Sequence, residues 1–393
     1  MPRSPSGIYI SIPFCRSKCS YCNFVSDVFA REMVAGYVGR VCDDIHLAQQ
    51  TASRMDGVLE PRADSIYLGG GTPTILTSGQ IVRIFATLRQ QFEIDPAAEI
   101  TVECAPGSLT PEMLEALVRV CVNRVSLGVQ SFVDAEAAAV GRLHTRATVH
   151  NDIARLRASG ITNINIDLIA GLPHQTEASW HTSLAETIAA GAPHASVYML
   201  EIDENSRLGR QLIAGGTRYH AHFVPDEDAV ADFYEHACAR LGAAGIVQYE
   251  ISNFARQGME SRHNLKYWTR QSYIGFGLDA HSMLEGPDGA VRFSTADSLD
   301  EFMAGAPLRR TPLPPRDAME ETFFLGLRLT QGIDMKAVSA RLSVDAEGMF
   351  GETIRELESS GMLESTGDTV RLTPVGRLLS NEVFQRFIRV ASS

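Results

Sequence analysis

Hydrophobic residues in the first half of the chain fall into short runs, and the stretches between these runs have helical spacing. The runs are rich in β-branched residues, which predicts strands that are buried on both faces. We expect strands at residues 7–12, 64–68, 99–103, 124–127, 163–168 and 195–200. We expect helices at residues 31–50, 78–91, 111–121, 134–140, 148–159 and 177–190.

Residues at the ends of these segments support the helix assignments. Thr110 followed by Pro111 is typical of a helix N-terminus, and Gly160 and Gly191 are suited to end helices. Strand and helix alternate six times, so we predict an α/β fold with a parallel sheet, either open or curled into a partial barrel. Such sheets bind ligands at the carboxyl ends of their strands. Motifs that directly follow the strands are therefore the candidate site.

The alternation fades after about residue 205. We expect one long helix at residues 226–241 and a strand-like run at 247–251. Residues 304–316 are rich in proline, which predicts a linker or a domain boundary.

Beyond this segment, helices are followed by a hairpin. Helix-like stretches begin near Asp317, Asp334 and Asp345, a hairpin-like stretch spans residues 362–373, and a last helix begins near Pro374. This order suggests a winged-helix-like module. We therefore predict a barrel at residues 1–240, an α+β extension with its linker at 241–315, and the module at 316–393.

Composition limits the classes of function. The chain has 393 residues, 45% of them hydrophobic, and a formal net charge of −12. This acidity argues against a general nucleic-acid binder, which needs basic surface, and acidic residues also outnumber basic ones in the C-terminal module. The sequence has neither a signal-peptide pattern at its start nor an apolar run long enough for a membrane span. We expect a cytoplasmic protein with reduced thiols.

Three cysteines, Cys15, Cys19 and Cys22, follow the first expected strand. Thiolates at this spacing can hold three irons of a [4Fe–4S] cluster and leave the fourth iron open to a ligand. Zinc also binds close thiolates, but a structural zinc site needs a fourth protein ligand, and the nearest histidine is His46. The spacing alone leaves both metals open. The scattered cysteines are expected to be core or incidental residues: Cys42, Cys104, Cys121 and Cys238.

Polar residues and glycines gather where the expected strands end. Gly69–Gly71 follows the second strand, where it could form a tight turn or let the backbone approach a ligand. Glu103, Gln130 and Asp167 lie at strand ends, and Arg142 follows shortly after the fourth strand. Any one of them could be a cap or a surface residue. Together, on one edge of a sheet, they could bind an amino group, a carboxylate and ribose hydroxyls.

Four motifs together resemble a known family. Cys-x-x-x-Cys-x-x-Cys, Gly-Gly-Gly-Thr-Pro, Gly-Val-Gln-Ser-Phe and Asp-Leu-Ile-x-Gly-Leu-Pro are similar to those of the radical S-adenosylmethionine (SAM) enzymes, in the branch of the oxygen-independent coproporphyrinogen III dehydrogenase, HemN. The resemblance runs nearly end to end. It implies a partial (βα)6 barrel in which Cys15, Cys19 and Cys22 ligate the cluster and SAM chelates the fourth iron.

The resemblance also implies a set of SAM contacts, with Tyr21 acting through its backbone. The positions are Tyr9, Tyr21, Gly70, Gly71, Thr72, Glu103, Gln130, Arg142 and Asp167. No catalytic residue is assigned. The chain departs from the family pattern at Ser11, where the family has histidine, and at Ala105, where it has asparagine.

Within this branch the chain resembles the HemW family of haem-binding proteins. The dehydrogenase has a further cysteine two residues after the third, and here that position is Phe24. The stretch His263-Asn-Leu-Lys-Tyr267-Trp268 is similar to the family's haem-associated His-Asn-x-x-Tyr-Trp motif. The resemblance implies that His263 ligates haem iron while Tyr267 and Trp268 pack on the porphyrin. Structural packing is the alternative, and His281 is a second candidate ligand.

These features predict a haem chaperone of HemW type that binds a [4Fe–4S] cluster, SAM and haem. Its expected partners are haem and haem-accepting respiratory proteins, with membrane association only through such a partner. A homodimer stays open, as does cleavage of SAM. The alternative functions are dehydrogenation of coproporphyrinogen III and a HemN-like C-methyltransferase or cyclopropanase; a winged-helix DNA regulator is disfavoured.

Overall fold

A parallel sheet forms the centre of the computed structural model, which describes residues 4–26, 28–29, 31–287 and 289–388. Its first six strands lie side by side in chain order, and every neighbouring pair is parallel. Their apolar residues are buried beneath the surrounding helices, as expected for a sheet covered on its outer face. These strands are β1 (Ser6–Ile12), β2 (Arg62–Gly70), β3 (Glu93–Cys104), β4 (Arg124–Gln130), β5 (Asn163–Ala170) and β6 (His194–Met199).

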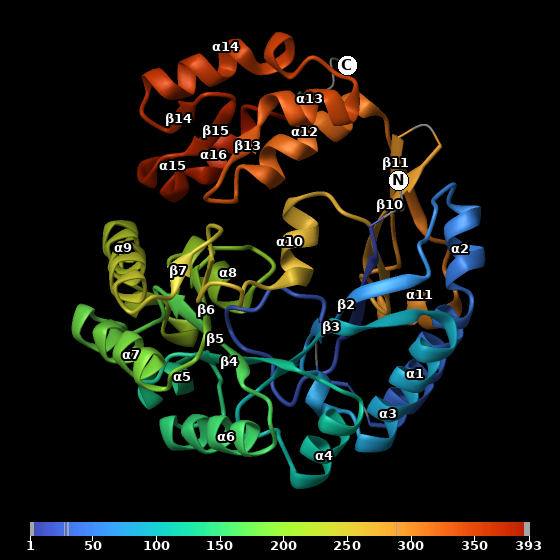
Figure 1. Ribbon diagram of the computed structural model, residues 1–393. Coiled ribbons are helices and arrows are strands. Elements are labelled where there is room, and N and C mark those ends of the chain that lie inside the picture. Colours follow the sequence, from blue (N-terminus) through green and yellow to red (C-terminus); the bar gives the residue numbers. More distant parts are fainter. Residues whose placement is uncertain (1–3, 27, 30, 288, 389–393) are drawn as a thin grey trace.

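The helices between these strands lie on the outer side of the curved sheet (Figure 1). Thr110 caps the fourth of them by accepting a hydrogen bond from the Met113 N–H, and Gly160 and Gly191 adopt positive φ after two others, as predicted. The expected helix at residues 31–50 is divided in two near Leu47. The helices are α1 (Arg31–His46), α2 (Ala48–Arg54), α3 (Ser78–Gln91), α4 (Pro111–Arg119), α5 (Asp134–Ala139), α6 (Arg146–Ala158) and α7 (Glu177–Ala189), with a short 3-10 turn η1 (Pro73–Ile75).

The sheet extends beyond the predicted strands on both sides. Six further strands give a sheet of twelve within the described residues, in the order β12-β11-β10-β9-β1-β2-β3-β4-β5-β6-β8-β7. The expected strand at 247–251 is reduced to two residues, and Glu250 forms only an isolated bridge with Leu329. The added strands are β7 (Val247–Gln248), β8 (Asn253–Ala255), β9 (Tyr273–Phe276), β10 (His281–Gly286), β11 (Gly289–Ser294) and β12 (Arg309–Leu313).

Residues 304–316 are more than the expected linker. β12 lies within this segment and pairs antiparallel with β11, so the segment forms one edge of the large sheet. Pro312 is compatible with this role because an edge strand has an unpaired side, where a missing N–H costs nothing. The other elements of the middle of the chain are α8 (Arg207–Ile213), η2 (Arg218–Phe223), α9 (Glu227–Ala243), α10 (Arg262–Trp268) and α11 (Leu299–Ala304).

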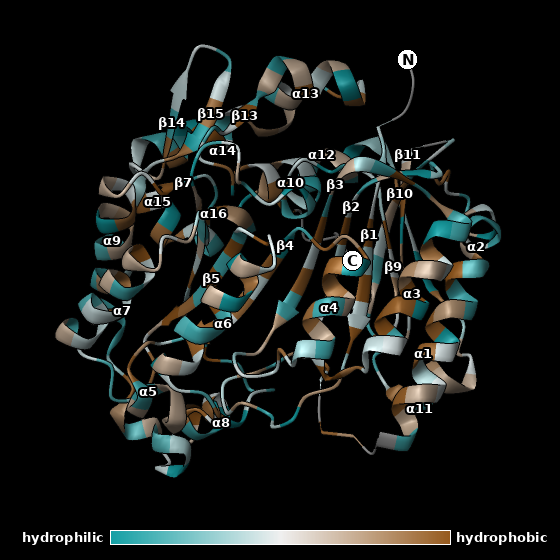
Figure 2. Cartoon of the chain, turned by 60° about the horizontal axis from the view of Figure 1, so that its bottom comes forward, coloured by the Kyte–Doolittle hydropathy of each residue, from teal (hydrophilic) through white to brown (hydrophobic). Residues whose placement is uncertain are grey.

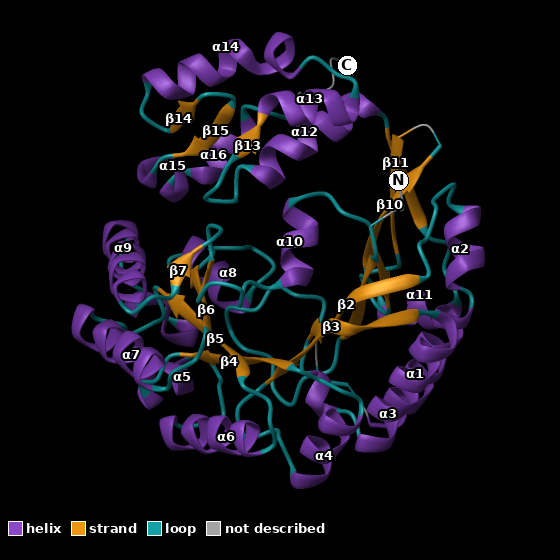
Figure 3. Cartoon of the chain, viewed as in Figure 1, coloured by secondary structure: helices purple, strands orange, loops and turns teal. Residues whose placement is uncertain are grey.

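The C-terminal module has the expected order of helices followed by a hairpin (Figure 3). Its core is separate from that of the barrel and includes Phe323, Phe350 and Phe387, whose rings pack on one another. The hairpin belongs to a three-stranded sheet of order β13-β15-β14. The elements are α12 (Pro315–Gly326), β13 (Ile333–Asp334), α13 (Met335–Leu342), α14 (Ala346–Ser359), β14 (Leu363–Thr366), β15 (Thr369–Leu372), α15 (Pro374–Leu378) and α16 (Ser380–Gln385).

The two ends of the barrel are closed by different parts of the chain. Figure 2 shows α10 and the C-terminal module at the amino ends of the strands, whereas α5 and α8 lie at the carboxyl ends. The cysteine loop follows β1 directly and therefore lies at the carboxyl end. Among the described residues, no helix has both the length and the apolar character required to cross a bilayer.

Candidate functional site

A cavity of about 400 Å³ lies inside the barrel. It begins at the cysteine loop and reaches Asn253 of β8 and Asn264 of α10. Because α10 covers the amino ends of the strands, the cavity connects the two ends of the barrel.

The three loop cysteines line this cavity as free thiols. Cys22 N–H donates to the Cys19 carbonyl (3.3 Å), which tightens the loop, and Arg142 Nη1 lies 3.5 Å from Cys19 Sγ. Burial raises the pKa of the Cys15 and Cys22 thiols. Burial thus favours the protonated thiols, and a bound metal would favour the thiolates.

The positions of potential ligand atoms bear on the choice between the two candidate metals. Sulfur ligands of one tetrahedral zinc, each at about 2.3 Å from the metal, lie about 3.8 Å apart. Of the described residues, one group of three potential ligand atoms lies within 4.8 Å, and this group is Glu177, His181 and His236 on outer helices, not the cysteines. The three cysteines are thus not held as ligands of a single tetrahedral metal, and in a cluster each thiolate would bind a different iron.

The glycine run at the end of β2 packs against the segment that leads into the cysteine loop. Gly71 N–H donates to the Ile12 carbonyl and Thr72 N–H to the Phe14 carbonyl, both at 2.8 Å. A Cβ atom on Gly71 would lie 2.7 Å from the Phe14 oxygen, and Gly70 has a φ of +103°. Glycine is therefore required here for the close packing of two loops. Gly70, Gly71 and Thr72 all line the cavity, as expected.

Glu103 lies in the cavity wall at the end of β3. Its carboxylate accepts hydrogen bonds from Tyr67 Oη (2.8 Å) and the Gly70 N–H (3.1 Å). Burial raises the pKa of Glu103 to about 7. A ligand amino group would favour the ionised form, so this carboxylate is well suited to bind one.

Gln130, Arg142 and Asp167 lie in the same cavity. Arg142 donates through Nη2 to the Gly128 carbonyl, whereas its buried Nε has no hydrogen-bond partner among the described residues. Asp167 accepts from Ser126 Oγ at 2.9 Å, and burial raises the pKa of Asp167. The structure thus brings the predicted amine, carboxylate and ribose contacts together at one end of the cavity.

The two predicted tyrosines differ in their positions. Tyr21 lines the cavity and packs against Val140, Ile169 and Leu172. Tyr9 does not line it; its ring stacks at 6.1 Å on that of Tyr67, which does. Tyr9 therefore supports the cavity wall from behind.

The predicted haem residues lie on α10, at the opposite end of the barrel. His263 is only 1% exposed, and both of its ring nitrogens are occupied, Nδ1 by Ser65 Oγ (3.0 Å) and Nε2 by Tyr267 Oη (2.8 Å). Trp268 lies under the Arg328 guanidinium, 4.4 Å from its ring centre. His263 can ligate an iron only after it releases one of these hydrogen bonds. His281, the second candidate, is exposed and lies 3.6 Å from Asp279.

The sequence reasoning missed the polar residues inside the strands. They alternate along each strand because every second side chain points inward. This period of two within strands expected to be apolar was the signal that could have revealed them. Those that line the cavity are Arg124 and Ser126 of β4, Asn165 of β5, Ser196 and Tyr198 of β6 and Asn253 of β8; Asn264 of the helix α10 was missed as well.

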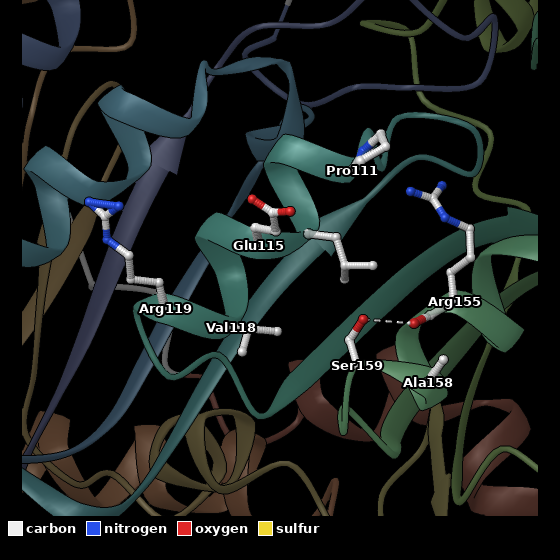
Figure 4. A pocket seen from close by; sticks show the side chains of 8 residues that line it. Pro111, Glu115, Val118, Arg119, Arg155, Ala158 and Ser159 are labelled. Atoms are coloured by element: carbon white, nitrogen blue, oxygen red, sulfur yellow. Dashed lines mark hydrogen bonds between the residues drawn. The ribbon is translucent and has the colours of Figure 1, made fainter.

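A second hollow, of about 640 Å³, lies outside the barrel between α4 and α6 (Figure 4). Its lining combines apolar side chains such as Val118 with Arg119 and Arg155, and Ser159 donates to the Arg155 carbonyl at 3.0 Å. It contains none of the strand-end motifs, so we place the functional site in the inner cavity.

Comparison with known proteins agrees with this arrangement. Residues 9–186 match the Radical SAM superfamily, and residues 313–379 match the HemN C-terminal domain. A protein of Bacillus subtilis (strain 168) named Heme chaperone HemW is 34% identical over 384 residues, which cover 97% of this chain and 98% of that protein. Its namesake in Lactococcus lactis subsp. lactis (strain IL1403) is 31% identical, with 99% and 98% covered. The chain belongs to the HemW family.

A solved structure shares the fold. The coproporphyrinogen III oxidase HemN from Escherichia coli, described as a radical SAM enzyme, matches with a TM-score of 0.83 at 23% identity, covering 98% of this chain and 91% of that one. Membership of the radical SAM superfamily implies a [4Fe–4S] cluster and SAM. The residues at the carboxyl end of the cavity of this HemW-family chain fit both groups.

Proposed function

We propose that this protein is cytoplasmic, carries haem and delivers it to haem-dependent respiratory proteins. A [4Fe–4S] cluster and SAM would be bound in its barrel. Two curated relatives over nearly the full length are named heme chaperones. The observation that carries the proposal is that the cavity connects the cysteine loop at one end with Asn264 of the His-Asn-x-x-Tyr-Trp helix at the other.

The residues at the carboxyl end would divide the work of binding. Cys15, Cys19 and Cys22 would ligate the cluster, Glu103 would pair with the SAM amino group, and Arg142 would pair with its carboxylate. When bound, the cluster supplies an electron for reductive chemistry on SAM. The remaining SAM contacts would be Tyr9, Tyr21, Gly70, Gly71, Thr72, Gln130 and Asp167.

Phe24, two residues after the last cysteine of the triad, favours carriage of haem over dehydrogenation of a porphyrinogen. Phe24 occupies the position of the dehydrogenase's additional cysteine, is 65% exposed, and lies in the cavity wall. A phenyl ring can neither ligate a metal nor transfer a proton. It can pack against an apolar ligand at the mouth of the cavity.

We infer a matching division of the chain. Residues 1–240 would hold the cluster and SAM, and residues 241–315 would contribute α10 with His263, Tyr267 and Trp268 to haem binding. Residues 316–393 would support α10 from outside, because Arg270, two residues after α10, pairs with Glu321 of α12 at 2.9 Å.

The test is a haem titration of anaerobically reconstituted protein, followed at the Soret band, and then an assay of coproporphyrinogen III conversion in the same sample. We expect stoichiometric haem binding without conversion. Conversion without stable haem binding would instead identify a dehydrogenase. Transfer of the bound haem to an apo-haemoprotein, compared with transfer of free haem, would test delivery.

A further inference from the structure

Arg124 is a buried cation that the proposed roles leave unexplained. It is the first residue of β4, is 1% exposed, and lines the cavity. Its Nε has no hydrogen-bond partner within the described part of the chain. No carboxylate of the described residues forms an ion pair with its guanidinium within 4.0 Å. A buried charge without a partner is costly, so such a group favours an anionic ligand.

The polar groups around Arg124 bond mainly to one another. Asn165 Nδ2 donates to Ser126 Oγ (2.7 Å) and Ser196 Oγ (2.9 Å), and Ser196 Oγ donates to Asn253 Oδ1 (2.9 Å). This network fixes the side chains of β4, β5, β6 and β8 that line the cavity. None of its hydrogen bonds includes the guanidinium.

The neighbouring strands show the same deficit at the level of Arg124. Thr101 of β3 and Asn163 of β5 are its register partners on either side. Their Oγ1 and Oδ1 atoms are also buried without a hydrogen-bond partner among the described residues. Three adjacent strands thus leave buried polar atoms without hydrogen-bond partners at one level of the sheet.

Arg124 forms no ion pair within 4.0 Å with an acidic residue of the described chain, although its charge acts to lower the pKa of both Glu103 and Asp167. Glu103 and Asp167 are bound to their own donors, and burial raises the pKa of both carboxyl groups. The cavity that Arg124 lines also reaches Asn264 of α10.

SAM would not reach this point in the arrangement proposed above. Its carboxylate would pair with Arg142 at the carboxyl end, beside Cys19. Arg124 begins the strand that Gln130 ends, so the backbones of these two residues lie about 20 Å apart along β4 at 3.3 Å per residue. The lower cation therefore serves another ligand.

We propose that the guanidinium of Arg124 binds a carboxylate of a second organic ligand, a porphyrin propionate, which enters the cavity beside Asn264 of α10. The proposal rests on the proposed function, because it names a contact of the carried haem. It makes Arg124 a binding residue that lies outside the α10 motif but faces the same end of the cavity. A guanidinium suits this role since it can bind a carboxylate through two parallel hydrogen bonds.

The experiment compares porphyrins that differ only in their carboxylates. Haem and haem dimethyl ester, and metal-free coproporphyrin III and its tetramethyl ester, are titrated into cluster-reconstituted protein with SAM present. The variants are Arg124→Met and Arg124→Lys, with Arg119→Met as an exposed control. We expect wild type to prefer each free acid over its ester by roughly tenfold to a hundredfold, and Arg124→Met to remove this preference. Arg124→Lys should retain part of it.

Two further readouts determine what Arg124 does. The melting temperature of the Arg124→Met protein without porphyrin should not fall below that of wild type, because methionine removes an unpaired buried charge. SAM affinity should be unchanged. A marked fall in melting temperature would make Arg124 a structural residue, and an equal loss of SAM affinity would place it in the SAM site. Either result would overturn the inference.

The probes also separate this inference from the proposed function. Haem binding with equal affinity for acid and ester in wild type would overturn the role of Arg124 and leave haem carriage intact. Acid-dependent binding of coproporphyrin without any haem binding would support Arg124 and contradict haem carriage. Absence of binding by every porphyrin would refute both.

Discussion

The carboxyl end and the amino end of the barrel cavity contain similar polar side chains in different states of pairing. At the carboxyl end the cysteines are free thiols and Arg142 Nε lacks a partner among the described residues. At the amino end Lys266 pairs with Asp64 at 2.8 Å, and Glu99 accepts from the Arg262 and His263 N–H groups. The first end offers unpaired groups to ligands, whereas several polar groups of the second are paired within the protein. Arg124 Nε, Thr101 Oγ1 and Asn163 Oδ1 are exceptions, because they lack partners among the described residues.

The difference follows from where the side chains come from. At the carboxyl end the cysteines and Arg142 are supplied by loops, so they can remain unsatisfied until a ligand arrives, whereas Glu103 and Asp167 come from strands. Residues at the amino end close the barrel, where every unpaired polar atom would reduce stability. Substitutions at the two ends should therefore change different measurements.

The largest effect is expected for the cysteine triad. Cys19→Ala should abolish the iron–sulfur absorbance of reconstituted protein, because three thiolates are the minimum set for the cluster. Iron and sulfide analysis measures this directly. Cys121→Ala is the matched control, since Cys121 is exposed and lies outside the cavity. Unchanged iron and sulfide content in Cys19→Ala would refute the cluster assignment.

The next effect concerns SAM. Arg142→Met should weaken SAM binding by roughly tenfold to a hundredfold, as expected for loss of a charge-assisted hydrogen bond. Equilibrium dialysis of cluster-loaded protein with labelled SAM provides the measurement. The urea midpoint should change little, because the side chain serves the ligand more than the fold. Wild-type affinity in this variant would remove Arg142 from the site.

At the amino end the expected effect is a pH dependence of stability. Burial lowers the pKa of His263 to about 3, so the folded state stays unprotonated while the unfolded state binds a proton below about pH 6.5. The free energy of unfolding should therefore fall as the pH drops from 6.5 towards 3, by up to about 1.4 kcal/mol per pH unit from this residue. Urea unfolding of wild type and His263→Gln should show a smaller slope in the variant. His46→Gln is the control. Equal slopes of unfolding free energy against pH in wild type and His263→Gln would contradict this prediction.

The smallest expected effect is a change in haem affinity when the hydrogen bond between His263 and Tyr267 is removed. If His263 ligates haem iron through Nε2, it must first release Tyr267 Oη. Tyr267→Phe should then raise haem affinity several-fold, because it removes a competing bond worth about 1 kcal/mol. His263→Ala should change the Soret spectrum. Should both variants bind haem as wild type does, the iron ligand lies elsewhere, with exposed His281 as the next candidate.

The limits of sequence reasoning follow the same division. β1 to β6 and the outer helices were predictable because apolar runs and caps are local signals, and the strand-end motifs marked the carboxyl end. Arg124 was missed since a charge at the start of a strand resembles a flanking surface residue. β9 to β12 were missed because short antiparallel strands owe their structure to their partners in the sheet. The partners of His263 are distant in sequence and could not be read from its motif.

The proline in β12 has a consequence for how the protein behaves among its own copies. β12 is the edge of the large sheet, where an exposed row of backbone groups could recruit a strand from another molecule. Pro312 offers no N–H there, and Arg309 and Arg310 add charge held by Asp297 and Asp56. An edge of this composition disfavours pairing with a strand of another molecule. The barrel can therefore keep an unpaired edge strand without promoting aggregation.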